Sequence, residues 1–161
     1  MKICIVGAGN AGCAHAFKLT ESGHNVSLLK TSHAMHDENF EEIQKNGGIW
    51  AIDHTNNDIR SFQKISLITR DFKAALSDVD MVLVMVQTIQ HEAIAKRIIP
   101  YVHNKIKVIM LIPGNLGSVY FKEEIKKDDI IFVEGESTPY DARIVEVGVV
   151  NILFKNVRNA V

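Results

Sequence analysis

Short apolar runs alternate with amphipathic stretches along most of the 161 residues. The run at residues 81–86 is apolar at every position, which is typical of a parallel strand covered on both faces. The pattern predicts strands at 2–6, 26–29, 67–69, 80–86, 107–112 and 130–133, and helices at 10–22, 37–45, 72–76, 90–102 and 123–127. Because strands and helices alternate, we predict an α/β fold with a Rossmann-type, doubly wound and mostly parallel sheet.

Two segments depart from this alternation. Residues 49–65 form two apolar segments around Asn56-Asn57-Asp58, which predicts a β-hairpin insertion. Residues 144–154 alternate weakly and predict antiparallel strands near the C-terminal end. No linker or low-complexity segment divides the chain, and its length suits one core, so we predict a single domain spanning residues 1–161.

A glycine-rich turn follows the first predicted strand. Residues 7–12 have the sequence Gly-Ala-Gly-Asn-Ala-Gly, and a helix-compatible run comes directly after them. In a dinucleotide-binding fold the first glycine makes the tight turn, the second lets the backbone approach a pyrophosphate, and the third lets the helix pack closely. The anion then sits at the positive end of the helix dipole. We therefore predict that a dinucleotide contacts Gly7, Gly9, Asn10, Ala11 and Gly12.

Two later loops belong to the same predicted edge of the sheet. Ligands of doubly wound sheets bind outside the carboxyl ends of the strands, and the loops at 86–90 and 112–116 follow two of the predicted strands. We predict further cofactor contacts from Val86, Gln87, Gln90, Pro113, Gly114 and Asn115.

The segment after the second strand bears on which dinucleotide binds. NAD-selecting sites place an acidic residue there to bond the ribose 2′-hydroxyl. This chain instead has Lys30-Thr31-Ser32, with no carboxylate before Asp37. One cation and two hydroxyl donors suit a 2′-phosphate. We predict NADP, bound by Lys30, Thr31 and Ser32, with NAD as the alternative if Lys30 is only a solvated lysine at a strand end.

Composition and charge narrow the class of protein. Hydrophobic residues make up 47% and charged residues 23%, and the net charge of −1 gives no basic footprint for nucleic acid. No apolar run is long enough to span a bilayer, and glycines interrupt the N-terminal run, so we predict neither a membrane partner nor a targeting segment. Cys4 and Cys13 fit buried thiols in a reducing, cytoplasmic compartment. His33 and His36 fit surface histidines, so we predict no metal site.

The segment at residues 134–143 resembles a motif of the opine dehydrogenases, the family of octopine and nopaline dehydrogenases. That motif has a Glu, four variable residues, Pro-Tyr, two further residues and an Arg. The corresponding residues here are Glu134, Pro139, Tyr140 and Arg143, without a gap. The chain departs from the family at Gly135, where a Thr is usual. Residues 81–102 and Pro113-Gly114-Asn115 are also similar to segments of that family.

The resemblance implies reductive condensation of an α-keto acid with the amine of an amino acid, with hydride supplied by the nicotinamide. It covers nearly all of the chain but only the family's N-terminal half. The family carries its substrate site, and a catalytic His with an Asp partner, in a helical C-terminal domain. We therefore assign no catalytic residue within 1–161 and expect a small-molecule substrate to bind through that further domain. Whether the protein forms a homodimer stays open.

Two alternatives remain beside this interpretation. Residues 26–48 and 86–90 also resemble ketopantoate reductase, which reduces a ketone. That family usually has Lys where this chain has Gln87, and Asn-Gly where it has Gly114-Asn115. Rossmann domains also occur in regulators, so the second alternative is a non-catalytic nucleotide-sensing module.

Four further side chains are candidates for a role in the site. Two interpretations stay open for the pair Glu134 and Arg143 and for His91, and one is preferred for Trp50. Glu134 and Arg143 either form a buried ion pair, or Arg143 binds a substrate carboxylate. His91 either faces the cofactor or simply begins a helix. We expect Trp50 to pack within the hairpin rather than to offer a stacking surface.

Overall fold

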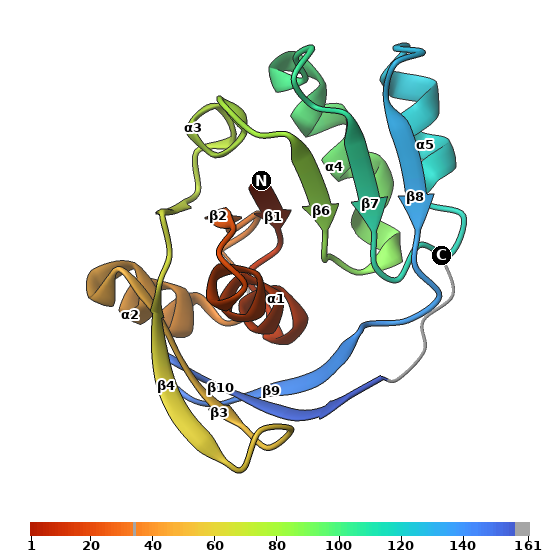
Figure 1. Cartoon of the computed structure of the whole chain (residues 1–161). Coiled ribbons are helices and arrows are strands. Elements are labelled where there is room, and N and C mark those ends of the chain that lie inside the picture. Colours follow the sequence, from red (N-terminus) through yellow and green to blue (C-terminus); the bar gives the residue numbers. More distant parts are fainter. Residues whose placement is uncertain (34, 157–161) are drawn as a thin grey trace.

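The computed structural model describes residues 1–33 and 35–156, which form two β-sheets and the helices that cover them (Figure 1). The larger sheet has the order β5-β2-β1-β6-β7-β8, and the smaller one the order β4-β3-β10-β9. The strands of the larger sheet are β1 (Lys2–Val6), β2 (Asn25–Leu29), β5 (Leu67–Thr69), β6 (Met81–Val84), β7 (Val108–Leu111) and β8 (Ile131–Glu134). The helices are α1 (Asn10–Glu21), α2 (Asp37–Asn46), α3 (Phe72–Leu76), α4 (His91–Ile98) and α5 (Ser118–Glu124), with short 3₁₀ turns η1 (Thr88–Gln90) and η2 (Ile99–Tyr101).

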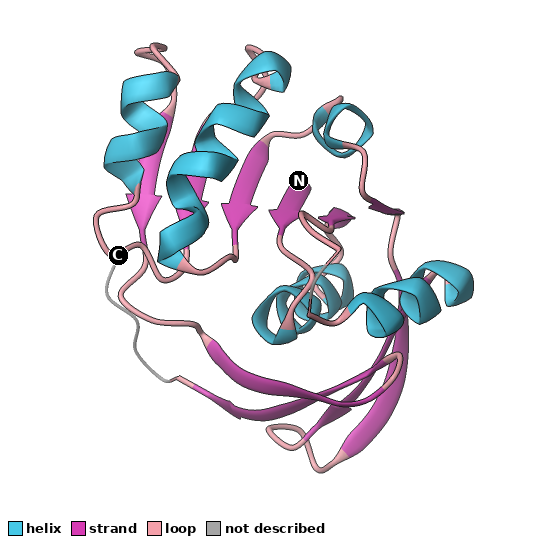
Figure 2. Cartoon of the chain, turned by 180° about the vertical axis from the view of Figure 1, so that it is seen from behind, coloured by secondary structure: helices cyan, strands magenta, loops and turns pink. Residues whose placement is uncertain are grey.

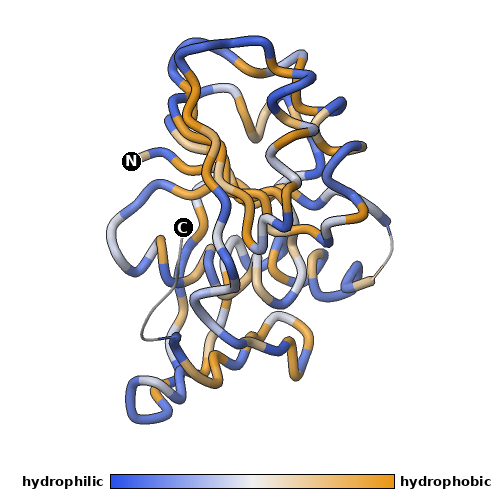
Figure 3. The backbone as a smooth tube through the Cα atoms, turned by 90° about the vertical axis from the view of Figure 1, so that its right-hand side faces the viewer, coloured by the Kyte–Doolittle hydropathy of each residue, from blue (hydrophilic) through white to orange (hydrophobic). Residues whose placement is uncertain are grey.

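All neighbouring strands of the larger sheet are parallel, as predicted. Side chains alternate between two apolar clusters, because successive residues of a strand point to opposite faces. In β1, Ile3 and Ile5 join the cluster under α1, whereas Cys4 and Val6 join the cluster under α4 and α5. Figure 2 shows α4 and α5 covering their face of the sheet, and Figure 3 shows hydrophobic segments gathered in the interior of the protein.

The smaller sheet joins two segments that are far apart in the sequence. The predicted hairpin forms β3 (Gly48–Asp53) and β4 (Ile59–Lys64), and the C-terminal strands are β9 (Tyr140–Glu146) and β10 (Val149–Lys155). β10 pairs antiparallel with β9, as expected, but parallel with β3, which builds one mixed sheet. This sheet packs against α1 on the side away from the larger sheet (Figure 1).

Several predicted boundaries are wrong: the strand expected at 80–86 spans only 81–84, the C-terminal strands expected within 144–154 begin at Tyr140, and two helices differ. The helix expected at 123–127 lies at 118–124, because the Glu134 carboxylate of β8 accepts the Ser118 N–H at the start of α5. The helix expected at 90–102 is α-helical only over 91–98, with a 3₁₀ turn at each end. Both cysteines are free and buried, as expected, and burial raises the pKa of each thiol to about 12.

Candidate functional site

The glycine-rich turn between β1 and α1 has a backbone that only small residues allow at two of its positions. Gly7 has a φ of 118°, and a Cβ there would lie 2.6 Å from the Met85 carbonyl oxygen. A Cβ on Gly12 would lie 1.8 Å from the Gly7 carbonyl oxygen, so this glycine allows the helix to approach the strand. A Cβ on Gly9 would meet only the His36 ring, at 3.9 Å. The space above Gly9 is therefore open to a ligand.

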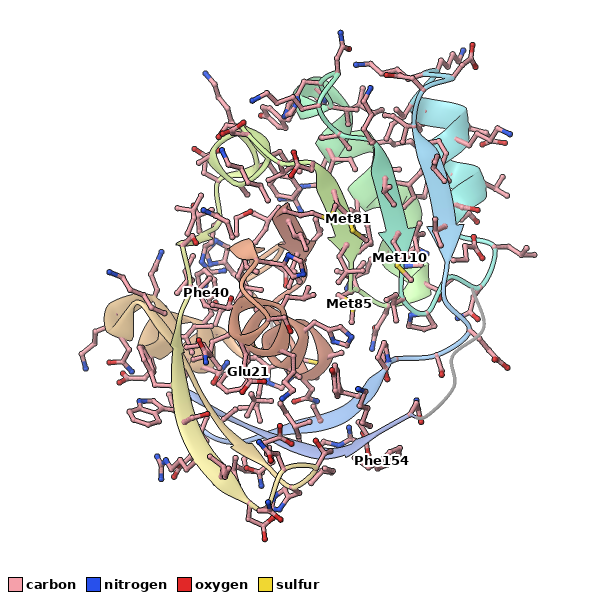
Figure 4. All side chains as sticks on the ribbon, viewed as in Figure 1. Glu21, Phe40, Met81, Met85, Met110 and Phe154 are labelled. Atoms are coloured by element: carbon pink, nitrogen blue, oxygen red, sulfur yellow. The ribbon has the colours of Figure 1, made fainter. Side chains whose placement is uncertain are left out.

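A cleft of about 320 Å³ lies over this turn, at the carboxyl ends of β1, β2 and β6. Ten of the fourteen predicted cofactor residues line it: Gly7, Gly9, Asn10, Ala11, Lys30, Thr31, Ser32, Val86, Gln87 and Gln90. Gly12, Pro113, Gly114 and Asn115 do not line it. The remaining lining residues, which were not predicted as cofactor contacts, are Ala8, Met35, His36 and Met85. Figure 4 places Met85 just beyond the end of β6.

The start of α1 presents main-chain N–H groups to this cleft. The first α-helical hydrogen bond joins the Cys13 N–H to the Gly9 carbonyl at 2.9 Å, so the N–H groups of the preceding residues have no partner within the helix. Asn10 lines the cleft, and its side-chain oxygen accepts the Ile144 N–H of β9 at 2.8 Å. The turn is therefore held both by its own helix and by the smaller sheet.

Lys30 is buried rather than solvated, with 5% of its surface exposed. Its Nζ donates to the Met35 carbonyl at 2.8 Å and lies 3.3 Å from Asp37 Oδ1. The expectation that no carboxylate is near Lys30 is wrong, because the loop before α2 turns back and brings Asp37 to the end of β2. Burial raises the pKa of Asp37, but the Arg70 and Lys30 side chains outweigh it and hold that pKa below its usual value.

Two arginines that sequence reasoning missed meet the same segment from outside the cleft. Arg70 donates to the Ser32 carbonyl at 2.7 Å, and Arg97 donates to the Thr31 carbonyl at 2.8 Å. Arg70 directly follows β5, which is the neighbour of β2. The doubly wound strand order therefore carried a signal for Arg70, since it places the ends of the second and third strands side by side. Nothing comparable marked Arg97, which lies near the C-terminal end of α4.

The loop after β7 forms a compact turn at the other side of the sheet edge. Pro113 follows a cis peptide bond, and a Cβ on Gly114 would lie 2.3 Å from the Glu134 side chain. Asn115 donates to the Thr88 hydroxyl at 3.0 Å and so joins this loop to η1. The predicted loop is therefore adjacent to the cleft-lining segment 86–90, although its own residues do not line the cleft.

The first interpretation of Glu134 and Arg143, a buried ion pair between them, is wrong. Glu134 accepts the main-chain N–H groups of Leu116 and Ser118 at 2.9 and 2.7 Å, whereas Arg143 pairs with Asp141 at 2.9 Å. The two residues belong to different sheets, which separates side chains that are close in the sequence. Burial raises the pKa of Glu134, but its bonds to Ser118 and Leu116 outweigh that effect and lower it.

His91 begins α4 and is fully buried, and it does not line the cleft. Its ring packs against Phe121 with centroids 6.2 Å apart, and a Cβ on Gly117 would lie 1.9 Å from its Nδ1. Burial lowers the pKa of His91, against the opposing effects of the Val86 main chain and Glu134. The side chain therefore packs the 86–91 segment against α5, which is the second of the two interpretations above.

The remaining expectations concern metals, membranes and Trp50. Within residues 1–33 and 35–156, no group of three or more His, Cys, Asp or Glu side chains is arranged to hold a metal ion. Among the helices described, none has the length and apolar character needed to cross a membrane. Trp50 packs on Phe62 across the hairpin, with ring centroids 5.2 Å apart, as expected.

The family described as Ketopantoate reductase PanE/ApbA matches residues 3–132 of this sequence. The chain belongs to this family. Its members are NAD(P)-dependent oxidoreductases, and the match to the PanE/ApbA family includes the glycine-rich turn at residues 7–12. The match ends before the segment that resembles opine dehydrogenases. No protein with a curated description matches the sequence.

Solved structures show the same fold over the whole PanE/ApbA domain and beyond it. Octopine dehydrogenase with NADH and L-arginine has a TM-score of 0.80 at 21% identity, over 97% of this chain. Yersinopine dehydrogenase with NADP+ has a TM-score of 0.82 at 14% identity, over 99%. A putative 2-dehydropantoate 2-reductase from Enterococcus faecalis has a TM-score of 0.69 at 22% identity, over 96%. The chain spans 40% of each of the first two proteins and 46% of the third.

Proposed function

We propose that this chain is the NADP(H)-binding domain of an oxidoreductase that reduces an α-keto acid or its imine. The observation that carries the proposal is the cleft over Gly9, where a Cβ would project into open space and where Lys30 lines the same cavity. A pyrophosphate needs close backbone approach and free N–H donors, and the turn offers both.

Each part of the cleft has a separate task in this proposal. The N–H groups that begin α1 hold the pyrophosphate, with the helix dipole adding attraction for its charge. Lys30, Thr31 and Ser32 bind the adenosine end, and Val86, Gln87 and Gln90 border the opposite side. Pro113, Gly114 and Asn115 support the nicotinamide side through the contact of Asn115 with Thr88. The bound nicotinamide supplies hydride, and the protein positions it and keeps its surroundings fixed.

For the reaction itself, we propose the opine type: an α-keto acid condenses with an amino acid amine, and the resulting imine is reduced. The motif from Glu134 through Pro139 and Tyr140 to Arg143 supports this proposal. So do the TM-scores of octopine and yersinopine dehydrogenase, 0.80 and 0.82, which exceed the 0.69 of the putative 2-dehydropantoate 2-reductase at similar coverage of this chain. The substrate site and the proton-transfer residues would lie in a further domain, so we assign no catalytic residue to this chain.

A second candidate is reduction of a ketone of the ketopantoate type. The family match over residues 3–132 favours it. Two positions weigh against it. This chain has Gln87 where that family usually has Lys, and Gly114-Asn115 where it usually has Asn-Gly.

Turnover measurements separate these candidates. A protein that carries this domain together with a substrate domain is given NADPH and an α-keto acid, first alone and then with an amino acid. Consumption of NADPH only after the amino acid is added supports the opine reaction, and consumption with the keto acid alone supports ketone reduction. NADPH binding without consumption under any condition supports a nucleotide-sensing module and contradicts the proposed enzyme. The isolated 161-residue chain is expected to bind NADPH without consuming it.

A further inference from the structure

Three cationic side chains lie at the end of β2. Lys30 directly follows this strand and lines the cleft. Arg70 donates to the Ser32 carbonyl and Arg97 to the Thr31 carbonyl. The three come from different elements of the fold: β2 and its loop, the end of β5, and α4. The fold therefore gathers positive charge at one point of the sheet edge.

Both guanidinium groups are held in place by aromatic rings. The Arg70 guanidinium lies 4.6 Å from the centroid of Phe40, and that of Arg97 lies 4.1 Å from the centroid of Phe72. Phe40 belongs to α2 and is labelled in Figure 4. Stacking fixes the plane of an arginine and leaves its remaining N–H donors free to meet another acceptor. These side chains are therefore oriented before any ligand binds.

The charges of this group do not balance internally. Asp37 Oδ1 lies 3.1 Å from Arg70 Nη2 and 3.3 Å from Lys30 Nζ, so one carboxylate serves two cations. Within the described part of the chain, Arg97 makes no ion pair. Three cations against one carboxylate leave an excess of about two positive charges, which equals the charge of a phosphomonoester near neutral pH.

We propose that Arg70 and Arg97 are specificity-determining residues that bind, together with Lys30, the 2′-phosphate of an adenosine nucleotide, and that Asp37 is the counter-charge that weakens this site. The inference rests on the proposed binding of NADP(H), and it names residues beyond those that line the cleft. A neutral ribose diol would need an acceptor and no excess of cations. A 2′-phosphate would use all three cations through charge-assisted hydrogen bonds.

Binding of adenosine 2′,5′-bisphosphate and of adenosine 5′-monophosphate, measured by calorimetry at low salt, tests the proposal without the nicotinamide. Arg97→Gln and Arg70→Gln are each expected to weaken the bisphosphate about tenfold and to change the monophosphate less than about twofold. Arg60→Gln is the matched control, because Arg60 also stacks on an aromatic ring (Trp50) and pairs with a carboxylate (Glu146) but lies on the smaller sheet. It should leave both affinities unchanged.

Asp37→Asn should act in the opposite direction. Removing the shared carboxylate frees Lys30 and Arg70, so the bisphosphate should bind several-fold tighter and more steeply salt-dependent, with the monophosphate unchanged. A residue that only shaped the loop would not produce a gain. If Asp37 instead reads a ribose hydroxyl, Asp37→Asn would weaken NADH, which would overturn the proposal.

Two further outcomes are distinguishable. If wild-type protein binds neither NADPH nor NADH, the proposed function fails. If it binds both equally and the arginine variants leave bisphosphate affinity unchanged, the proposed dinucleotide binding stands and this inference is wrong. Should Arg97→Gln fail to fold, Arg97→Lys keeps the charge but loses the planar fork; unchanged bisphosphate affinity in both Arg97→Lys and Arg70→Gln would also overturn it.

Discussion

The side chain of Asn10 connects the glycine-rich turn to the smaller sheet: its Oδ1 accepts a hydrogen bond of 2.8 Å from the N–H of Ile144. Asn10 is the first residue of α1, and Ile144 lies in the middle of β9. A bond between residues 134 positions apart fixes β9 beside the turn that we propose to hold the pyrophosphate. The same side chain therefore serves the fold and the site.

Asn10→Asp separates these two roles. The carboxylate can still accept from Ile144, so the free energy of unfolding should change by less than about 0.5 kcal/mol. Its negative charge would repel a pyrophosphate, so NADPH affinity should fall about tenfold or more. Calorimetric titration and urea denaturation measure the two effects. Asn10→Ala loses the hydrogen bond to Ile144 and should lower the free energy of unfolding by about 1 kcal/mol. Equal NADPH affinity in Asn10→Asp and wild type would contradict the placement of the pyrophosphate.

Two glycines of the turn should respond differently to substitution. Gly9→Val should abolish dinucleotide binding but leave the protein folded, because a side chain there enters the cleft and not the core. Gly12→Ala should destabilise the fold by more than about 2 kcal/mol, because its Cβ would overlap the Gly7 carbonyl. Thermal denaturation with and without NADPH measures both. A Gly9→Val protein stabilised by NADPH as strongly as wild type would contradict the proposed pyrophosphate site over Gly9.

Much of the fold was predictable from the spacing of apolar residues. The run at 81–86 became the buried β6 and its continuation, and the turn at 7–12 lies where the glycine pattern placed it. Sequence periodicity could not show that β10 would pair with β3, because it reports which face of a strand is apolar and not which strand lies beside it. The parallel pairing of β10 with β3 in the smaller sheet is therefore seen in the structure and was not predicted from the sequence.

The candidate site was predictable where its residues follow strands directly. Lys30, Thr31 and Ser32 follow β2 and line the cleft, and their binding of a cofactor stays a prediction. Asp37 was separated from Lys30 by a loop whose return path the sequence does not specify, and the pair at 3.3 Å was missed for that reason. The sequence also could not exclude an ion pair between Glu134 and Arg143, which are close in the sequence. The structure excludes it because the chain passes from one sheet to the other between these two residues.

Glu134 should stabilise the start of α5. Its carboxylate accepts from Leu116 and Ser118, so Glu134→Ala should lower the free energy of unfolding by about 1–2 kcal/mol, as the loss of a helix cap does. Urea denaturation measures this. Arg143→Ala should have an effect below about 0.5 kcal/mol, because Arg143 is exposed and its ion pair is with Asp141 of its own strand. Equal losses of unfolding free energy in Glu134→Ala and Arg143→Ala would contradict this prediction and would support an ion pair between the two residues.

Acidification should destabilise the fold through two buried histidines. Burial lowers the pKa of His15 and of His91, so the folded state binds fewer protons than the unfolded state, in which histidine titrates near about 6.5. Their contribution is complete above that value and declines as the pH falls through it. The free energy of unfolding should therefore decrease between about pH 7.5 and 5.5. His91→Gln should show a shallower decrease than wild type, and an identical slope would contradict the assignment of neutral, buried imidazole.

Calorimetric titration of the wild-type 161-residue chain with NADPH and with NADH at low salt tests the proposed dinucleotide binding most directly. We expect one binding site, with NADPH bound at least about tenfold more tightly than NADH, since a charge-assisted lysine–phosphate contact contributes roughly 1.5–3 kcal/mol. The difference between the two affinities should shrink as salt is added. Equal affinities would leave a dinucleotide-binding domain with NAD as its cofactor, and no binding of either nucleotide would contradict the central claim.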